Sequence, residues 1–203
     1  MNKNLIIVFT RNPELGKVKT RLAKTIGDEA ALNIYKFLLE HTEKTIRNIN
    51  SDKAIYYSVQ LRADDIWDSS IYQKYQQEGE DLGIRMLNAF KNGFEDNYEK
   101  IVIVGSDLFD LEAKYIEKAL NKLDNYNVVI GPAEDGGYYL LGMKNLYPEV
   151  FKNKAWGTET VRKDTLEDLK SESVFLLDEL NDIDTYDDIK HNQTLKSFIL
   201  QND

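Results

Sequence analysis

Short runs of consecutive apolar residues alternate along the chain with longer stretches in which apolar residues recur every three or four positions. The short runs are typical of strands buried on both faces of a sheet. They predict strands at 5–9, 54–59, 72–76, 101–104, 128–132, 138–141 and 174–177. The longer stretches predict helices at 28–49, 81–94, 112–123 and 158–170, after residue 184, and in the tail from residue 190 to 203. This alternation of strands and helices indicates an α/β domain.

Two helix starts carry residues that favour capping. Thr158 is the expected N-cap of the helix that runs to Lys170, because a threonine hydroxyl can accept a hydrogen bond from the first turn. For the helix after residue 184, either Thr185 or Asp184 can serve as N-cap, with Asp187 and Asp188 in the first turn. Capping alone would therefore explain the acidic cluster in this region.

Composition narrows the class of protein. The chain has 203 residues, 42% hydrophobic and 30% charged, which fits one globular domain over residues 1–203. The net charge of −9 argues against general nucleic-acid binding, which needs a broad basic face. With no cysteine and two histidines, a thiolate site, a histidine metal site and a Ser-His-Asp triad are all disfavoured. No apolar stretch is long enough to span a membrane, so we expect a cytoplasmic enzyme; the sequence indicates no oligomeric state.

An apolar strand at 101–104 runs directly into Gly105-Ser106-Asp107. Open α/β sheets bind ligands at the carboxyl ends of their strands, so Asp107 is expected where a ligand is held. A carboxylate there suits Mg²⁺ or Mn²⁺, which prefer oxygen ligands. The alternative is that Asp107 only caps the helix that starts near Glu112.

The loop after the first strand concentrates positive charge in an acidic chain. Arg11, Lys17, Lys19 and Arg21 lie within eleven residues of one another. A basic loop after the first strand of an α/β sheet is well placed to hold phosphates. The loop matches neither the Walker spacing nor the dinucleotide fingerprint, and a solvated basic turn is the alternative.

Two further loops have both a structural and a functional interpretation. In the loop before the helix at 81–94, Gln77 could bind a base edge, and Gly79 and Gly83 would let the backbone approach a ligand; a plain connection is the alternative. Asp135-Gly136-Gly137 reads as a hairpin turn. Functionally, the carboxylate of Asp135, with that of Glu134, would lie near a cation or an acceptor.

Together the motifs resemble a known family. They are Phe9–Leu22, Gln77–Gly83, Gly105–Asp107, Gly131–Tyr138, Trp156–Thr158 and Asp182–Thr185. In this order they resemble the bacterial glycosyltransferase-A-like family, formerly a domain of unknown function, within the nucleotide-diphospho-sugar transferase superfamily. The chain is also similar to guanylyl- and cytidylyltransferases that build coenzyme precursors. The family pattern has a proline where Phe109 stands, which leaves the shape of the loop after Asp107 open.

The resemblance implies a single-domain fold of the glycosyltransferase-A type, α/β, with a mixed, mostly parallel sheet and helices on both faces. It implies Asp107, Lys19 and Arg21 as catalytic residues, and Mg²⁺ or Mn²⁺ on Asp107 with Asp184, ranked above Asp135, as second ligand. The nucleotide or its phosphates would contact Arg11, Gly16, Lys17, Lys19, Arg21, Gln77, Gly79 and Gly83. The acceptor would contact Glu134, Asp135, Gly136, Gly137 and Trp156.

The predicted activity is metal-dependent transfer from a nucleotide-activated donor to a small-molecule acceptor. The resemblance favours glycosyl transfer from a nucleotide sugar. The dense cations near the N-terminus suit a triphosphate, so transfer of a nucleoside monophosphate from a nucleoside triphosphate to a phosphorylated acceptor is the alternative. A non-catalytic nucleotide-binding protein is the third hypothesis, because no general base is evident; Glu134 and Asp135 are candidates by position only.

Overall fold

The computed structural model describes residues 3–200 and shows one seven-stranded sheet with the strand order β3-β2-β1-β4-β6-β5-β7. The strands are β1 (Asn4–Thr10), β2 (Asp52–Tyr57), β3 (Tyr72–Gln76), β4 (Lys100–Val104), β5 (Val128–Pro132), β6 (Tyr138–Met143) and β7 (Val174–Leu176). Only β6 runs antiparallel to its neighbours β4 and β5. A mixed, mostly parallel sheet was predicted, and the structure confirms it.

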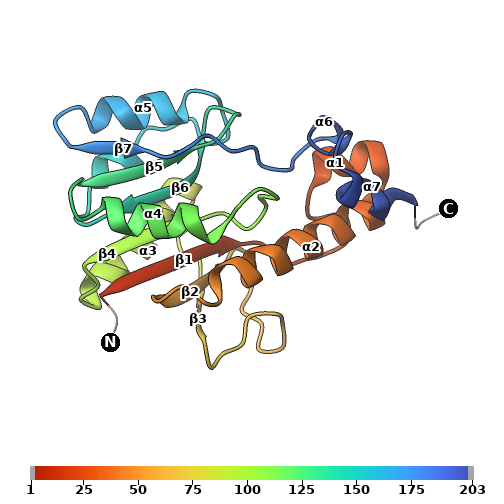
Figure 1. Ribbon diagram of the computed structural model, residues 1–203, viewed down its shortest axis with the longest axis horizontal. Coiled ribbons are helices and arrows are strands. Elements are labelled where there is room, and N and C mark those ends of the chain that lie inside the picture. Colours follow the sequence, from red (N-terminus) through yellow and green to blue (C-terminus); the bar gives the residue numbers. More distant parts are fainter. Residues whose placement is uncertain (1–2, 201–203) are drawn as a thin grey trace.

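Helices cover both faces of this sheet. The helices are α1 (Thr20–Ile26), α2 (Asp28–Ile46), α3 (Leu82–Glu95), α4 (Ala113–Lys122), the 3₁₀ turn η1 (Pro148–Phe151), α5 (Val161–Asp168), α6 (Tyr186–Ile189) and α7 (Gln193–Leu200). Side chains of α2 and α4 pack on one face, and those of α3 and η1 pack on the other. The helices α1, α6 and α7 gather around the start of α2, to the right in Figure 1. The predicted helices on both faces are therefore present.

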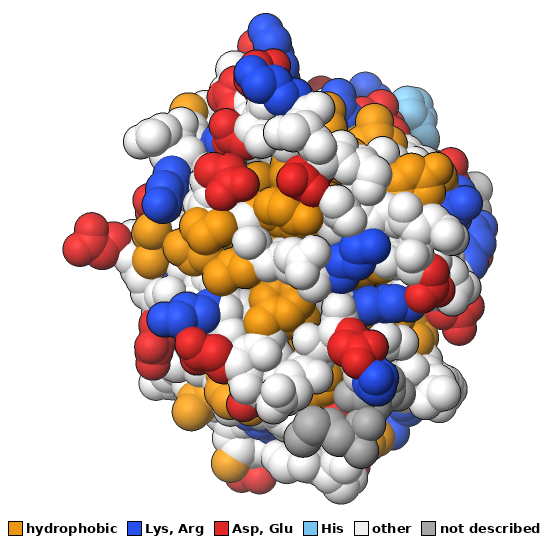
Figure 2. Space-filling model, turned by 90° about the vertical axis from the view of Figure 1, so that its left-hand side faces the viewer, with side chains coloured by type: hydrophobic (Ala, Val, Ile, Leu, Met, Phe, Trp, Pro, Cys, Tyr) orange, Lys and Arg blue, Asp and Glu red, His pale blue; other side chains and the backbone are white. Residues whose placement is uncertain are grey.

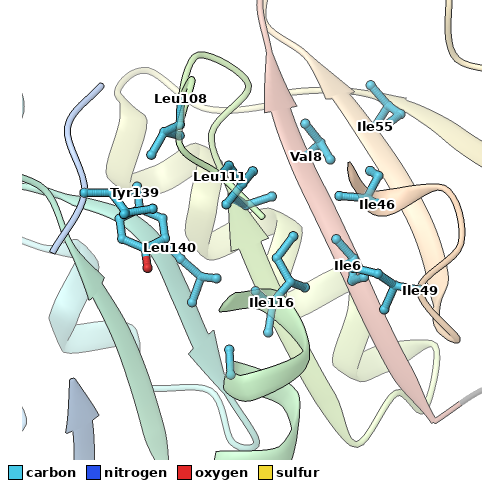
Figure 3. Packing of buried hydrophobic residues seen from close by; sticks show 14 of the residues in the cluster. Ile6, Val8, Ile46, Ile49, Ile55, Leu108, Leu111, Ile116, Tyr139 and Leu140 are labelled. Atoms are coloured by element: carbon cyan, nitrogen blue, oxygen red, sulfur yellow. The ribbon is translucent and has the colours of Figure 1, made fainter. Parts of the chain in front are cut away.

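Alternation along the strands divides the core into two layers. On β1, Ile6 and Val8 face α2 and α4, whereas Leu5 and Ile7 face α3. Figure 3 shows Ile6 among buried side chains of the core layer between the sheet and α2. Burying one such side chain contributes about 1.5–3 kcal/mol, so both layers hold the central strands, and with them the strand ends, in fixed positions.

One predicted helix start was wrong, one of two alternative caps was confirmed, and one helix was missed. The helix α1 lies where a loop was expected, because its short, polar sequence buries only Leu22 and gives no clear period. Thr158 does not cap α5: its hydroxyl donates to the carbonyl of Ala155, and Thr160 precedes the helix. Of the two candidate caps for α6, Thr185 is the N-cap, in a capping box with Asp188. The predicted tail helix is α7, and residues 201–203 lie outside the described part of the chain.

The surface at the amino-terminal ends of the parallel strands carries charges of both signs, interspersed with small apolar areas (Figure 2). Within residues 3–200, no helix is long and apolar enough to cross a membrane. The cytoplasmic location stays a prediction.

Candidate functional site

The carboxyl ends of β1 and β4 bring the basic loop and Asp107 together. These strands pair in parallel, so the segments that follow them leave the same edge of the sheet. The Nζ atom of Lys19 donates to Oδ2 of Asp107 at 2.7 Å, across 88 positions of sequence. The Lys19 side chain is only 7% exposed, so this ion pair is largely shielded from water. The juxtaposition inferred from the two motifs is thus present in the fold.

The backbone of Lys19 is in an unusual conformation for a residue with a side chain. Its φ of 47° and ψ of 43° place it in the left-handed region, immediately before α1. Such a conformation costs roughly 1–2 kcal/mol for a residue other than glycine and is concentrated at functional sites. Burial lowers the pKa of Lys19, but the charge of Asp107 and the hydrogen bond to it, with smaller effects of Asp182 and Asp184, raise the pKa overall. Lys19 is therefore a fixed, charged group at the strand ends.

A cavity of about 570 Å³ opens beside this ion pair, and we call it the cationic cavity. Its charged lining is Arg11, Lys17, Lys19, Arg21, Arg85, Asp107, Asp135, Asp182 and Asp184. Arg21 donates to Oδ2 of Asp184 at 2.8 Å, at a solvent-exposed position. Arg85, which from sequence could reach a phosphate or an acid, donates from Nε to the carbonyl of Gly79 at 3.0 Å. All four basic residues of the first loop thus reach one cavity, with a fifth from α3.

The loop residues from Gln77 to Gly83 divide between lining and packing. Gln77 lines the cationic cavity, and its amide nitrogen donates to the carbonyl of Tyr56 at 2.9 Å. A Cβ atom on Gly79 would lie within 3.0 Å of Ile84 and Arg85, and one on Gly83 within 3.0 Å of Phe151 and Trp156. The glycines at 79 and 83 therefore permit close packing here, and their role in nucleotide binding stays a prediction.

Gly16 also has a structural task. Its φ of 67° places it in the left-handed region, in the turn of the first loop, and it does not line the cationic cavity. The contact of Gly16 with a nucleotide remains a prediction.

A second cavity, of about 220 Å³, adjoins the first, and we call it the apolar cavity. Its apolar lining includes Phe9, Met86, Ile103, Tyr138, Leu141 and Trp156, and its carboxylates are those of Asp107, Asp135 and Asp182. Of the predicted acceptor residues, Asp135, Gly137 and Trp156 line this cavity. Three carboxylates thus lie where the two cavities meet.

The other two predicted acceptor residues support the wall of the apolar cavity. Gly136 has a φ of 88°, and a Cβ atom on it would lie within 3.0 Å of the backbone of Glu159. Glu134 is exposed and lines neither cavity; its backbone N–H donates to the carbonyl of Leu180 at 3.1 Å. Their contact with an acceptor stays a prediction.

The segment at 177–185 crosses the strand ends from β7 to α6 (Figure 1), and we call it the crossing segment. Ile183 donates its backbone N–H to the carbonyl of Asp107 at 3.2 Å, which fixes the segment beside the ion pair. Asp182 precedes this contact and lines both cavities. Burial, and then the nearby charge of Asp107, raises the pKa of Asp182 to about 6. Asp182 is the residue that sequence reasoning missed.

The alternation Asp182-Ile183-Asp184 was the available signal. In an extended segment, residues two apart point to the same side, and Ile183 is buried on the opposite side. A helix cap explained the acidic residues equally well from sequence. In the structure Asp188, and not Asp182 or Asp184, provides the acidic partner of the capping box.

Phe109, which replaces the proline of the family pattern, anchors the loop after Asp107. Its ring stacks on those of Phe37 and His41 of α2, with centroids 6.2 and 6.1 Å apart. Leu108 beside it is buried. Apolar packing therefore holds this loop where the pattern would use a rigid residue.

A hard divalent cation at these strand ends would need ligands beyond the side chains that the structure describes. Within the described residues, no group of three or more His, Cys, Asp or Glu side chains is placed to hold a metal ion. Mg²⁺ in phosphoryl-transfer sites is commonly held by one or two carboxylates together with substrate phosphates and water. Asp107 and Asp182 supply two such carboxylates next to a cavity that suits phosphates. Asp184, the predicted second ligand, pairs with Arg21, and its role as a ligand stays a prediction.

Comparison with known proteins identifies relatives over the whole chain. Residues 42–158 match the family described as "Uncharacterized protein conserved in bacteria (DUF2064)". A crystal structure of a protein from Desulfovibrio desulfuricans G20, described as a candidate nucleotide-diphospho-sugar transferase, is 32% identical, has a TM-score of 0.88, and covers 100% of this chain and 96% of its own. These matches agree with the family and fold predicted from the motifs.

More distant relatives carry nucleotidyltransferase names. The 2-phospho-L-lactate guanylyltransferase of Methanocaldococcus vulcanius is 26% identical over 144 residues, which cover 70% of this chain and 62% of that protein. The chain thus spans about three fifths of the length of this curated relative. The 4-diphosphocytidyl-2C-methyl-D-erythritol synthase of Anaerococcus prevotii shares the fold, with a TM-score of 0.60 at 12% identity, covering 97% of this chain and 96% of its own.

Proposed function

The chain belongs to the DUF2064 family of the nucleotide-diphospho-sugar transferase fold, and from this membership and the site geometry we propose that it is a nucleotidyltransferase. It would transfer a nucleoside monophosphate from a nucleoside triphosphate to a small-molecule acceptor. The observation that carries the proposal is the ion pair of the buried Lys19 with Asp107, both of which line a cavity with five cations. The guanylyltransferase relatives support the same class of reaction.

In this reaction an acceptor oxygen attacks the α-phosphorus of the donor. The bond from the α-phosphorus to the oxygen that bridges to the β-phosphate breaks, and pyrophosphate leaves with the electron pair. A proton on the acceptor oxygen, where there is one, is released to water. Negative charge grows on the leaving oxygens, and positive groups placed there in advance stabilise it as it forms.

Lys19 is the group best placed for that task. A lysine ammonium has three N–H donors, and among the described residues the only hydrogen bond of Lys19 Nζ is to Asp107. Two donors are therefore free for phosphate oxygens. Arg11, Lys17 and Arg21 lie further out on the same cavity and would orient the donor.

Asp107 and Asp182 would hold a divalent cation together with phosphate oxygens, and such an ion would supply further charge stabilisation to the leaving pyrophosphate. This pairing differs from the Asp107–Asp184 pair expected from the resemblance. The Asp107–Asp182 pair is favoured because the charge of Asp107 raises the pKa of Asp182, whereas Asp184 accepts a hydrogen bond from Arg21.

Glycosyl transfer, ranked first from sequence, becomes the second candidate. The match to the Desulfovibrio protein, named for nucleotide-diphospho-sugar transfer, favours it. The ranking changes because five cations line the donor side, which suits a triphosphate, and because the curated relatives are guanylyltransferases.

The test offers the protein Mg²⁺ with each nucleoside triphosphate or with nucleotide sugars, plus a panel of hydroxyl and phosphate acceptors. Pyrophosphate release from a triphosphate supports the proposal, and release of a nucleoside diphosphate from a nucleotide sugar supports glycosyl transfer. Asp107→Ala should lower the rate at least about a hundredfold, since losing one such contact costs a few kcal/mol. Asp110→Ala, an exposed carboxylate three residues on, should not. Binding of nucleotides with no turnover on any acceptor would contradict both.

A further inference from the structure

The two adjoining cavities differ sharply in charge. The cationic cavity carries every lysine and arginine of the site, from Arg11 to Arg85. Among the described residues that line the apolar cavity, none is a lysine or arginine. Its charged lining consists of Asp107, Asp135 and Asp182, which line the cationic cavity as well. A ligand that extends from the cationic cavity into the apolar cavity would therefore leave the basic side chains behind and be faced by carboxylates alone.

The aromatic side chains in the lining of the apolar cavity are held in place by close packing. Trp156 packs so closely on α3 that a Cβ atom on Gly83 would lie within 3.0 Å of its indole ring. Phe9 stacks on Tyr56 with ring centroids 5.7 Å apart. Tyr138 lies on the same cavity, with its hydroxyl buried and without a hydrogen-bond partner among the described residues. Fixed aromatic walls of this kind favour a flat apolar group on the ligand.

The rim of the apolar cavity repels negative charge. The carboxylates of Asp107, Asp135 and Asp182 all line this one cavity. The one cation paired with them, Lys19, is engaged with Asp107 on the cationic side. A divalent ion on two of the carboxylates would still leave Asp135 without a compensating lysine or arginine in the cavity lining. A carboxylate or phosphate placed in this cavity would find like charges at the rim and no basic side chain to bind.

We propose that the acceptor body, meaning the part beyond its reacting oxygen, is flat, apolar and free of negative charge, and that it occupies the apolar cavity. That the ligand of this cavity is the acceptor rests on the proposed function. That this ligand is apolar and carries no negative charge rests on the lining of the cavity alone. The inference separates this chain from the curated relatives, which are named for 2-phospho-L-lactate, a compound with a carboxylate beside its phosphate.

The test uses three probes that share a hydroxymethyl group on a benzene ring and differ only in the charge opposite it. These are 4-methylbenzyl alcohol, 4-(aminomethyl)benzyl alcohol and 4-(hydroxymethyl)benzoate. The chain has two tryptophans, so Trp67→Phe leaves Trp156 as the single indole reporter on the apolar cavity. Dissociation constants are measured by fluorescence titration, with and without Mg²⁺. Calorimetry on the unaltered chain gives the same constants should the variant fold poorly.

We expect the neutral and cationic probes to bind at least tenfold more tightly than the benzoate. Asp135→Asn, which keeps the oxygen that accepts from the backbone of Gly137, should narrow that ratio at least threefold. Asp110→Asn, whose exposed side chain lines neither cavity, is the control and should leave it unchanged. Equal or tighter binding of the benzoate, or no binding of any probe, would overturn the inference. Probe binding is measured without nucleotide, so the two proposals can fail separately. Preference for the neutral and cationic probes, without turnover of any nucleotide, would contradict only the proposed function. Nucleotide turnover together with tighter binding of the benzoate would contradict only this inference.

Discussion

At the scale of single residues, the site gathers negative side chains that do not stabilise the fold. Asp107 has a cation partner, but Asp182 is half-buried close to it and pairs with no basic group in the described structure. A carboxyl held near a like charge is destabilising in its ionised form, and such arrangements are concentrated where binding or catalysis requires them. The stability of this region should therefore depend on pH through Asp182.

The first prediction concerns that dependence. The folded-state pKa of Asp182 is about 6, above its ordinary value of 3.8. The folded state therefore holds the proton more tightly than the unfolded state. The resulting stabilisation is fully present below about pH 4 and is lost as the pH rises through 6. Asp182→Asn should raise the Tm above pH 6, with the gain shrinking toward zero at pH 4, measured by thermal denaturation in a chelating buffer. A constant difference in Tm at every pH would contradict the assignment.

The second prediction compares two lysines of the first loop. Lys19 is 7% exposed and fixed by Asp107, whereas Lys17 is exposed and lines the same cavity. Hydrogen bonds to charged groups contribute about 1.5–3 kcal/mol when well placed, which is roughly 10- to 150-fold in affinity. Lys19→Met should weaken binding of the Mg²⁺ complex of the preferred nucleoside triphosphate by that factor. Lys17→Met should weaken it less than about fivefold, by calorimetry at one salt concentration. Equal losses would show that only net charge matters.

The residues that sequence could and could not predict differ in a physical way. Asp107 was predicted because it comes just after a buried strand, and Lys19 because it belongs to a cluster of basic residues. Asp182 could not be predicted, because its position depends on where the crossing segment lies, and that is fixed by a tertiary contact between Ile183 and the carbonyl of Asp107. The role of Gly83 was difficult to predict for a related reason. The sequence does not show whether a glycine leaves room for a ligand or, as here, for an indole ring of the protein itself.

At the scale of elements, hydrophobic period was a reliable guide where an element is buried. The bounds of the buried strand β5 were predicted without error, and those of β4 and α4 to within one residue. The helix α1 was missed because its stability comes from packing on α2 and not from its own sequence. The boundary errors at α5 have the same origin, since its first turn is fixed from outside by the hydrogen bond from the backbone N–H of Arg162 to the carbonyl of Gly136.

The third prediction concerns the contact between the turn at 133–137 and the segment before α5. Gly136 and Gly157 both have left-handed φ values, of 88° and 80°. A Cβ atom at 136 would clash with the backbone of Glu159, whereas one at 157 would meet nothing within 4 Å. Gly157→Ala should lower the free energy of unfolding by about 1 kcal/mol, the cost of the backbone conformation. Gly136→Ala should lower it by about 1–3 kcal/mol more, the cost of overpacking, by urea denaturation. Similar values for both variants would show that the two segments are not tightly packed.

The fourth prediction concerns the helix cap that holds the crossing segment. Oδ2 of Asp188 accepts from the backbone N–H groups of Asp184 and Thr185, at 3.0 and 2.6 Å. Asp188→Ala removes these bonds and should lower the free energy of unfolding by about 0.5–2 kcal/mol. It should also weaken Mg²⁺-dependent nucleotide binding, because Asp182 lies on the same segment. Asp187→Ala removes only an exposed pair with Lys190 and serves as the control. An Asp188→Ala protein that is less stable yet binds nucleotide normally would argue against Asp182 as part of the site.

At the scale of the whole molecule, the sheet separates two chemical environments along one edge. The net charge of −9 would repel a nucleoside triphosphate, and yet five basic side chains face one cavity near the ends of β1 and β4. Positive charge gathered at one edge of a negatively charged protein favours binding of a nucleoside triphosphate at that edge, while the rest of the surface disfavours it. Since β1 and β4 are the central strands, with the core packed on both faces, the edge should be nearly rigid before any ligand arrives.

The fifth prediction follows from this preformed edge. A ligand that binds only the folded state stabilises it by about 2.7 kcal/mol at a concentration of one hundred times its Kd. For a domain of this size, each kcal/mol shifts Tm by about 2–4 °C, so the preferred nucleoside triphosphate with Mg²⁺ should raise Tm by about 5–10 °C. A panel of the four triphosphates in a thermal-shift assay would identify the base. At the same ligand concentration the shift should fall by about half or more in Lys19→Met and persist in Asp110→Ala, because Lys19 lines the cationic cavity and Asp110 does not. No shift with any triphosphate, or an equal shift in Lys19→Met, would mean that nucleotide phosphates do not bind at the ends of β1 and β4.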